Sequence, residues 1–557
     1  MMMVAAVATG VARAEQPVAG PLLQPLSQER LNSAATNKTD FLLAHGDYKQ
    51  TRYHLADQIN RSNVKNLKLA WSFATGVKEG MQASPIVFDG VMLLSTSYNH
   101  VLAVDARSGK LLWRYQHKFS PTIQICCGPV NRGVEVLDGL VYLATLDAQL
   151  VALDLKTGAL VWQKQIDNPL NAYGATAAPL VVDGKVIIGV VGGEYGIRGK
   201  LRAFDAKTGN DLWTFYTTPE NSVGVWAETD ARGVKLNRDI AKEKALYAKI
   251  GDPYKTSGGP IWHSPAVDLK TRRLYFAVGN AAPDLDDSTR PGDNLYTASM
   301  VSIDLDTGKY VCHLQYVPHD IWDYDSASAV ILTDVLGKNG EQIPGVVLGQ
   351  KTGYIYVHDA RDCSLLRTAE ASSHINMYAI PTAEGVQIRP GNNGGITAPM
   401  AIDPKSHLAY TVTVEKTVRY YKTPHREYVV GKPDHGGVMK ADQGEIAWGE
   451  LVAANYDTGA IKWRVKKPTP MYAGPLATAG GLVFTGGTGD GEFGAYNSDT
   501  GEQLWSYKDK AGVDGFVSTY MLDGKQYIVV GAGGNSVLGH PRGDSFLVFA
   551  LDDNAKN

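Results

Sequence analysis

The segment AVDARSGKLLW, residues 103–113, contains the pattern that decides the fold. A small residue is followed two positions later by Asp105, then by Ser108-Gly109, and then by Trp113. The aspartate side chain can hydrogen-bond the backbone of a turn, and the glycine can adopt the positive φ that a tight turn requires. A large aromatic side chain on the next strand can pack against a neighbouring sheet. The segment therefore predicts two antiparallel strands joined by a tight turn.

The same pattern recurs along most of the chain. Its other copies are ALDLKTGALVW (152–162), AFDAKTGNDLW (203–213), SIDLDTGKYVC (302–312), AANYDTGAIKW (453–463) and AYNSDTGEQLW (495–505), with a weaker copy in VHDARDCSLL (357–366). The tryptophans at 71, 113, 162 and 213 are 42 to 51 residues apart. That spacing suits a four-stranded propeller blade of ~40–50 residues.

We therefore predict an all-β fold, an eight-bladed β-propeller. The chain is longer than eight such units, and we expect insertions at Glu220–Gly258 and Ser372–Gly395. Asp239–Ile250 is the one segment expected to be helical. The alternative is a set of unrelated hairpins packed as a sandwich.

Composition and the N-terminus address location and partners. The 557 residues have a net charge of −3, which gives no case for nucleic acid or an anionic membrane surface. Residues 1–14 end in Ala12-Arg13-Ala14, a small-x-small site that predicts a signal peptide and export to the periplasm. We expect a leader at 15–36, a propeller domain at 37–557, and no membrane span, since no other apolar run reaches ~20 residues.

The four cysteines suggest two kinds of chemistry. No CxxCH motif is present, so we expect no covalent heme on this chain and a separate electron acceptor. Cys126 and Cys127 are adjacent in QICCGPVNRG, and a bond between neighbours lies outside ordinary disulfide geometry. The sequence leaves open whether Cys312 and Cys363 pair.

The repeats, together with these residues, resemble the tryptophan-docking repeats of PQQ-dependent (pyrroloquinoline quinone) alcohol and methanol dehydrogenases. The resemblance runs from Leu55 to Gly534. Non-catalytic assembly scaffolds share such repeats, so the site residues must discriminate between an enzyme and a scaffold. In the family a vicinal disulfide lies against one face of the quinone, which implies a Cys126–Cys127 bond.

The resemblance implies further cofactor contacts. Arg132 matches the arginine that pairs with a quinone carboxylate, and Trp262 matches the tryptophan on the other ring face. Thr176 matches a threonine near the cofactor. Gln82 stands where a glutamate is usual, so its contribution as a cofactor contact departs from the family pattern.

The resemblance also implies a metal ion and a catalytic base. Glu194 and Asn280 match the metal ligands, and their oxygens suit a hard cation. Asp323 matches the catalytic aspartate, which removes the alcohol proton, and a nearby cation keeps such a group ionised. Lys351 matches the basic residue that hydrogen-bonds the quinone oxygens. For Glu194 alone, a surface turn glutamate is the alternative.

Asp325 addresses the identity of the metal. Alternation along an extended segment would aim the carboxylates of Asp323 and Asp325 to one side. Members of the family that use lanthanides have Asp at the second position, whereas members that use calcium have a small uncharged residue. With Glu194, three negative charges match a trivalent ion, so we expect a lanthanide rather than Ca²⁺. The alternative is a solvated or turn-capping aspartate.

The resemblance implies a periplasmic dehydrogenase that oxidises an alcohol with PQQ and passes electrons to a soluble cytochrome c. A sugar or polyol dehydrogenase and a non-catalytic scaffold remain alternatives, and the sequence leaves a homodimer open. Val191 stands where some members have Ser, and Thr397-Ala398 where an Asn-Trp pair is usual. Loss of that Trp predicts space for a larger substrate than methanol.

Overall fold

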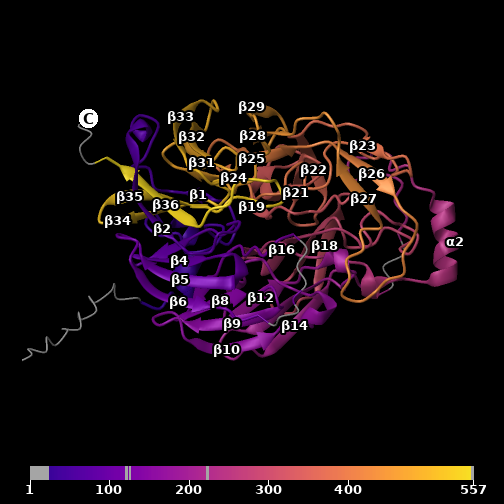
Figure 1. Cartoon of the computed structure of the whole chain (residues 1–557), viewed down its shortest axis with the longest axis horizontal. Coiled ribbons are helices and arrows are strands. Elements are labelled where there is room, and N and C mark those ends of the chain that lie inside the picture. The colour runs from indigo at the N-terminus through magenta and orange to yellow at the C-terminus, as the bar shows by residue number, and fades with distance from the viewer. Residues whose placement is uncertain (1–23, 120–122, 124–126, 221–224, 553–557) are drawn as a thin grey trace, which may run out of the picture.

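The computed structural model describes residues 24–119, 123, 127–220 and 225–552. The chain is almost entirely β-structure and runs around a centre, so that the C-terminal strands return beside an N-terminal strand (Figure 1). The all-β propeller prediction is confirmed at this level. No helix within the described ranges is both long and apolar enough to cross a membrane.

Within the described residues the strands form eight sheets of four or five strands and one sheet of three. The first four sheets contain β3 (Ile86–Phe88), β4 (Val91–Ser95), β5 (His100–Asp105) and β6 (Leu111–Gln116); β7 (Glu135–Leu137), β8 (Leu140–Ala144), β9 (Gln149–Asp154) and β10 (Leu160–Gln165); β11 (Leu180–Val182), β12 (Lys185–Gly189), β13 (Lys200–Asp205) and β14 (Asp211–Tyr216); and β15 (Ala266–Asp268), β16 (Arg273–Val278), β17 (Ser299–Asp304) and β18 (Tyr310–Gln315). Consecutive strands in each of these sheets are antiparallel neighbours.

The next four sheets complete the circuit. They contain β19 (Ile331–Leu336), β20 (Gln342–Gly349), β21 (Tyr354–Asp359) and β22 (Leu365–Glu370); β24 (Ala401–Asp403), β25 (Leu408–Glu415), β28 (Trp448–Asn455) and β29 (Ile461–Lys467); β30 (Leu476–Thr478), β31 (Leu482–Thr485), β32 (Glu492–Asn497) and β33 (Gln503–Lys508), with β1 (Tyr53–His54) parallel to β30; and β34 (Ser518–Leu522), β35 (Lys525–Ala532), β36 (Ser545–Leu551) and β2 (Leu67–Ala74). Pairing of β2 with β36 joins the two ends of the chain in one sheet.

The remaining elements are short helices and one small sheet. The helices are α1 (Gln28–Asn32) and α2 (Ile240–Ile250), with 3₁₀ turns at η1 (Ala34–Thr36), η2 (Val64–Asn66), η3 (Ser97–Asn99), η4 (Pro169–Asn171), η5 (Gly193–Tyr195) and η6 (Tyr254–Thr256). The predicted helix is confirmed: it is α2, and Asp239 caps it by accepting from the Lys242 amide. The small sheet is β23 (Val386–Ile388), β26 (Val418–Lys422) and β27 (Gly437–Ala441).

This small sheet uses one predicted insertion and one that the sequence did not reveal. Residues 372–395 supply β23, as expected, but residues 418–441 between β25 and β28 supply the two strands beside it. The second insertion went unrecognised because the sequence of its strands resembles that of the blade strands. No copy of the repeat lies between β25 and β28 to mark where the blade is interrupted.

The predicted turn chemistry is confirmed at the first repeat. Asp105 Oδ1 accepts from the backbone amides of Arg107 and Ser108 at 3.0 and 2.9 Å. Gly109 has a φ of 72°, in the left-handed region where a side chain would be strained. The same side-chain bonds occur at Asp154, Asp205, Asp304 and Asn455.

In the repeats that have a tryptophan, its indole lies on the turn of the following sheet. Trp113 on β6 donates from Nε1 to the Leu155 carbonyl at 2.9 Å, and a Cβ added to Gly158 would lie 2.4 Å from its ring. The other close indole–glycine pairs are Trp71–Gly109, Trp162–Gly209, Trp213–Gly308 and Trp463–Gly501. Trp505 donates to the Leu67 carbonyl at 2.9 Å and so connects the sheet of β33 to the sheet of β2.

At one junction a disulfide takes the place of this contact. Cys312 on β18 occupies the Trp position of its repeat and bonds Cys363, which occupies the Gly position of the next repeat. Cys363 has a φ of 65°, the conformation of the turn glycines. The pairing that the sequence left open is therefore a covalent link between the sheets of β18 and β22.

An N-terminal segment runs between the first strands of the sheets. Along residues 39–54, backbone groups or Tyr48 hydrogen-bond Val87 on β3, Glu135 on β7, Val181 on β11, Val267 on β15, Leu332 on β19, Ile402 on β24, Ala477 on β30 and Met521 on β34. The buried Arg52 guanidinium donates to the carbonyls of Pro475, Gly474 and Val517. One segment thus contacts all eight of the larger sheets in the described chain.

Replacing Cys312 and Cys363 together by serine should destabilise the protein. The bond closes a loop with a sequence separation of 51 residues, and its loss should lower the free energy of unfolding by about 2–4 kcal/mol. Urea unfolding followed by circular dichroism measures the change. The matched variant Cys312→Trp with Cys363→Gly should recover much of the loss. Equal stability of the wild type and the serine variant would contradict a structural role for this bond.

Candidate active site

The topology brings residues far apart in sequence to one end of the sheets. In an antiparallel pair, the start of one strand lies beside the end of the next. Seven of the predicted residues precede the first strand of a sheet: Gln82, Cys127, Arg132, Thr176, Trp262, Asp323 and Asp325. Three follow a second strand: Glu194, Asn280 and Lys351.

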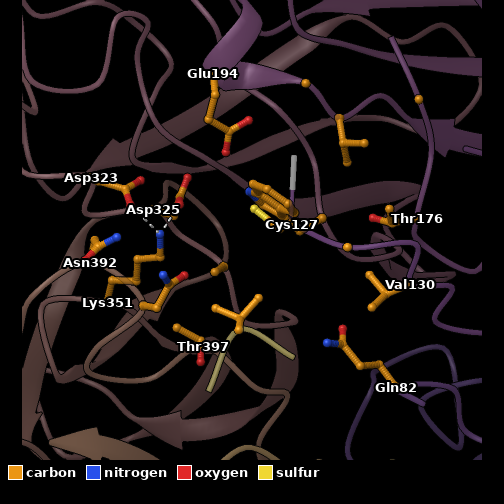
Figure 2. Close-up of a pocket in the computed structure, with 18 of the residues that line it drawn as sticks. Gln82, Cys127, Val130, Thr176, Glu194, Asp323, Asp325, Lys351, Asn392 and Thr397 are labelled. Atoms are coloured by element: carbon orange, nitrogen blue, oxygen red, sulfur yellow. Dashed lines mark hydrogen bonds and ion pairs between the residues drawn. The ribbon is translucent and has the colours of Figure 1, made fainter. Parts of the chain in front are cut away.

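A cavity of about 280 Å³ opens at this end. It is lined by nine of the predicted residues, namely Gln82, Cys127, Arg132, Thr176, Glu194, Trp262, Asp323, Asp325 and Lys351. Figure 2 shows Asp323, Asp325 and Lys351 together on one side and Thr176, Val130 and Gln82 on the other. Cys126 lies outside the described residues, so the Cys126–Cys127 bond stays a prediction.

Two aspartates and one lysine form the acidic side. Lys351 Nζ lies 3.2 Å from Asp323 Oδ2 and also contacts Asp325 Oδ2. Burial raises the pKa of Asp323 well above its usual range, and Lys351 opposes this. Burial acts to lower the pKa of Lys351, but both carboxylates outweigh it and raise that pKa.

The predicted convergence of the two carboxylates is confirmed, but the expected reason is wrong. Asp323 has a φ of 64°, which is the left-handed region and not extended backbone. Asp320 fixes the turn, because its carboxylate accepts from the amides of Trp322 and Tyr324 at 2.9 and 2.8 Å.

Asn280 lies directly behind the acidic group. Its backbone amide donates to Asp325 Oδ1, and its side-chain amide donates to Asp284 Oδ1 at 2.7 Å. Its Oδ1 atom is buried and accepts no hydrogen bond from the described residues. A Cβ on Gly193, the residue before Glu194, would lie 2.8 Å from this oxygen.

These donors fit a hard metal ion. Carboxylate oxygens from three acids and one unused amide oxygen are the ligands that Ca²⁺ and lanthanide-like cations prefer. Among the described residues, no three Asp, Glu, His or Cys side chains lie close enough together to hold a metal ion by themselves. The Lys351 ammonium instead occupies the position beside two of the carboxylates.

The opposite side of the cavity fits a flat anion. Arg132 Nη1 donates to Thr176 Oγ1 at 2.7 Å, while its buried Nε has no acceptor among the described residues. Trp262 adds an aromatic ring to the lining near the acidic group, because its Nε1 and Asp325 Oδ1 lie 2.6 and 2.5 Å from where a Cβ on Gly279 would stand; this Nε1 likewise lacks an acceptor in the described chain. Gln82 Oε1 accepts from the Tyr472 hydroxyl at 3.1 Å.

Two buried histidines lie near Arg132 and keep its surroundings free of added positive charge. Burial, followed by Arg52 and Arg132, lowers the pKa of His45 to about 3. Burial and Arg132 also lower the pKa of His263 well below its usual range. Both rings are therefore neutral near pH 7, and Arg132 remains available to an anionic ligand.

Sequence reasoning missed several residues that line the cavity. They are Asp284, Asn392, Asn393, His435, Met439, Tyr472, Asn535, Val537 and Leu538, among others. Asn392-Asn393 could have been found, because GNNGG directly precedes the departure noted at Thr397. His435 and Met439 lie on the unrecognised insertion and had no such signal. Thr397 and Val191 line the cavity, whereas Ala398 is buried and its carbonyl accepts from Ser328.

Comparison with known proteins identifies the family that has this fold and this set of cavity residues. The family model described as "PQQ: Glucose/ethanol/alcohol dehydrogenase, beta-propeller domain" matches residues 43–366 and 359–528. The chain belongs to the PQQ-dependent alcohol dehydrogenase family. This membership confirms the sequence-based resemblance and makes the chain a quinoprotein oxidoreductase.

Individual relatives of this PQQ-dependent dehydrogenase cover most of its length. Quinohemoprotein alcohol dehydrogenase ADH IIB of Pseudomonas putida is 34% identical over 92% of this chain and 78% of its own. Lanthanide-dependent methanol dehydrogenase of Methylorubrum extorquens is 32% identical over 92% and 90%. The solved structure of a europium-containing methanol dehydrogenase superposes with a TM-score of 0.82 at 28% identity, covering 94% of this chain and 100% of that one.

Replacing Lys351 by methionine should destabilise the metal-free dehydrogenase in a pH-dependent way. Without the ammonium, the pKa of buried Asp323 rises further, so the folded state keeps a proton that the unfolded state releases above a pH of about 4. The free energy of unfolding should therefore fall as the pH rises, by about 3–5 kcal/mol relative to wild type at pH 8 and less at pH 5. Urea midpoints at both pH values, with Lys351→Arg as control, measure this. An equal loss at both pH values would argue against the ion pairs.

Proposed function

We propose that this chain is a periplasmic quinoprotein dehydrogenase that oxidises a primary or secondary alcohol to an aldehyde or ketone. The observation that supports it is the convergence, on one cavity, of an arginine–threonine pair, a tryptophan ring and an acid–lysine group, with Asn280 directly behind that group. A scaffold for protein binding would have no use for such buried charges. The apolar part of the lining, including Val130, Leu146, Met439 and Leu538, favours an alcohol with an apolar substituent over a sugar or polyol.

We infer that the eight larger sheets are eight blades joined by tryptophan docking. The support is the series of contacts described above, in which the fourth strand of one sheet reaches the turn of the next. At the junction after β22, Arg367 takes the Trp position, and its Nη1 donates to the Tyr456 carbonyl at 3.3 Å. The N-terminal segment, which contacts all eight larger sheets of the described chain, also supports a single closed ring.

PQQ would bind between Trp262 and the Cys127 side of the cavity, with Arg132 and Thr176 holding a carboxylate, Gln82 on that same side and Lys351 at the opposite, quinone edge. A Cys126–Cys127 disulfide would form the facing surface. When bound, PQQ supplies the oxidant and the metal ion supplies a Lewis acid beside it. The protein contributes orientation, exclusion of water and placement of charge.

Asp323 is the proposed base that accepts the alcohol proton. Its carboxylate lines the cavity, and Lys351 at 3.2 Å favours its ionised form against the effect of burial. A metal ion held by Glu194, Asn280, Asp323 and Asp325 would favour ionisation further. Lys351 would bridge the two aspartates and orient them.

A lanthanide(III) ion is the proposed metal in preference to Ca²⁺. Glu194, Asp323 and Asp325 place three carboxylates at the proposed site, and three carboxylate ligands favour a trivalent ion over Ca²⁺, although the Lys351 ammonium offsets one of the three charges. The lanthanide-dependent relative supports the same choice. Electrons would pass to a soluble cytochrome c or similar acceptor, and the similarity to a methanol dehydrogenase (cytochrome c) subunit of Methylobacterium organophilum supports this. A homodimer remains a proposal.

Asp323→Asn should abolish turnover while PQQ stays bound. The amide keeps the shape but cannot accept the proton, so the rate should fall ~10²–10⁴-fold. Dye-linked alcohol oxidation, with bound PQQ measured by absorbance, tests the proposed function itself. Near-normal turnover in the variant would show that another group is the base. A wild-type protein without PQQ-dependent turnover would refute the proposed enzyme activity.

Reconstitution with PQQ and either La³⁺ or Ca²⁺ should give much higher activity with La³⁺. Asp325→Ala should lose the lanthanide-dependent activity, because one of three compensating carboxylates is removed. Asp499→Ala, an acid paired with Arg61 on the surface, serves as control. Full activity with Ca²⁺ alone, unchanged by Asp325→Ala, would overturn the lanthanide proposal and leave the quinoprotein proposal standing.

A further inference from the structure

The connection between β26 and β27, residues 423–436, joins the two segments that carry Glu194 and Asn280. The Asp434 amide donates to the Glu194 carbonyl at 2.8 Å. The Leu285 amide donates to the His435 carbonyl at 2.8 Å. The connection therefore fixes two backbone segments that follow different sheets.

A chain of side-chain hydrogen bonds runs from this connection to Asn280. His435 Nδ1 lies 2.7 Å from Asp284 Oδ2, and Asp284 Oδ1 accepts from Asn280 Nδ2 at 2.7 Å. Asp284 is 2% exposed, and each of its carboxylate oxygens is used in this chain. No repeat or motif in the sequence pointed to either Asp284 or His435.

Two bonds determine which way the Asn280 amide faces. Its Nδ2 donates to Asp284 Oδ1 at 2.7 Å and, more weakly, to the Ala281 carbonyl at 3.2 Å, so the NH₂ group points toward Asp284. Its Oδ1 atom then faces the opposite side, where the backbone of Gly193 approaches and where it accepts nothing from the described residues. A ligand asparagine needs this orientation, because only the oxygen can bind a cation.

We propose that Asp284 and His435 are positioning residues that hold the Asn280 oxygen toward the bound metal ion. This rests on the proposed function, since it presumes that a metal ion binds at Glu194, Asn280, Asp323 and Asp325. Partners behind a metal ligand typically contribute 10- to 100-fold to metal affinity. Asp284 would act through Asn280, and His435 would act through Asp284.

Gly436 keeps His435 in place. Its φ is 65°, and an added Cβ would lie 2.4 Å from Asp286 Cβ. The connection therefore packs directly on the residues that follow Asp284. Its other histidine, His425, contacts Asp286 Oδ2 at 2.9 Å and has no bond in the described chain to Asp284 or Asn280.

His435→Ala distinguishes positioning from simple electrostatics by the sign of its effect. Asp284 raises the pKa of His435 to about 9, so the imidazolium is a cation near the metal site. Electrostatics alone predicts tighter metal binding when that cation is removed, whereas positioning predicts weaker binding. We expect the holoenzyme loaded with La³⁺ to lose metal to a competing chelator at about 10- to 100-fold lower chelator concentration in the variant.

Three further variants complete the test. His435→Asn retains a donor near Nδ1 and should keep wild-type affinity, and His425→Ala should leave affinity unchanged. Asp284→Ala should weaken La³⁺ binding in the wild-type background but have little effect in an Asn280→Ala background, because its action passes through that amide. Thermal unfolding and bound PQQ, measured on each variant, identify any that fail to fold.

Unchanged or tighter La³⁺ binding in folded His435→Ala would overturn the proposal. So would an Asp284→Ala effect that is equally large with and without Asn280. A wild-type protein that binds neither La³⁺ nor Ca²⁺ would instead defeat the proposed function, so the two failures are distinguishable.

Discussion

The hydrogen bonds between residues 39–54 and the first strands of the sheets constrain the whole molecule. These bonds reach each of the eight larger sheets of the described chain, so the first strands of these sheets all lie close to residues 39–54. Arg52 strengthens the arrangement, because its buried guanidinium donates to the carbonyls of Pro475, Gly474 and Val517. Any residue that precedes a first strand is thereby brought toward the same end.

Contacts of the fourth strands hold neighbouring sheets together at the outer edge of the molecule. An indole ring on one sheet lies against the turn glycine of the next, and only glycine fits because both the positive φ and the close approach exclude a Cβ. The Cys312–Cys363 bond occupies the same two positions of the repeat. A covalent bond and an aromatic contact thus meet the same geometric requirement, which is a fixed distance between neighbouring sheets.

The arrangement of the sheets places the Arg132–Thr176 pair and the acidic side chains on different sides of the cavity. Thr176, which accepts from Arg132, lies on one side of the cavity, and Glu194, Asp323, Asp325 and Lys351 lie on the other. Burying so many acids is unfavourable unless cations compensate them, and Lys351 supplies only part of that charge. The excess of buried negative charge is a physical reason for a cation to bind here, and it explains why the family resemblance and the geometry agree.

Sequence by itself determined the local features. The Asp–x–x–Thr–Gly turn, the aromatic that follows it and the helix capped by Asp239 depend on contacts within a few residues, so they could be read directly. The same holds for nine cavity residues: eight of them lie in short motifs that resemble those of the family, and Gln82 was recognised as a departure from one.

Tertiary structure decided what depends on distant segments. The pairing of Cys312 with Cys363, the approach of Lys351 to both aspartates and the left-handed backbone at Asp323 could not be predicted from spacing. His435 and Asp284 are 151 positions apart, and only an insertion folded across the cavity brings them together. Local sequence fixes backbone preferences over a few residues, whereas the orientation of a buried amide depends on which carboxylate the fold places beside it.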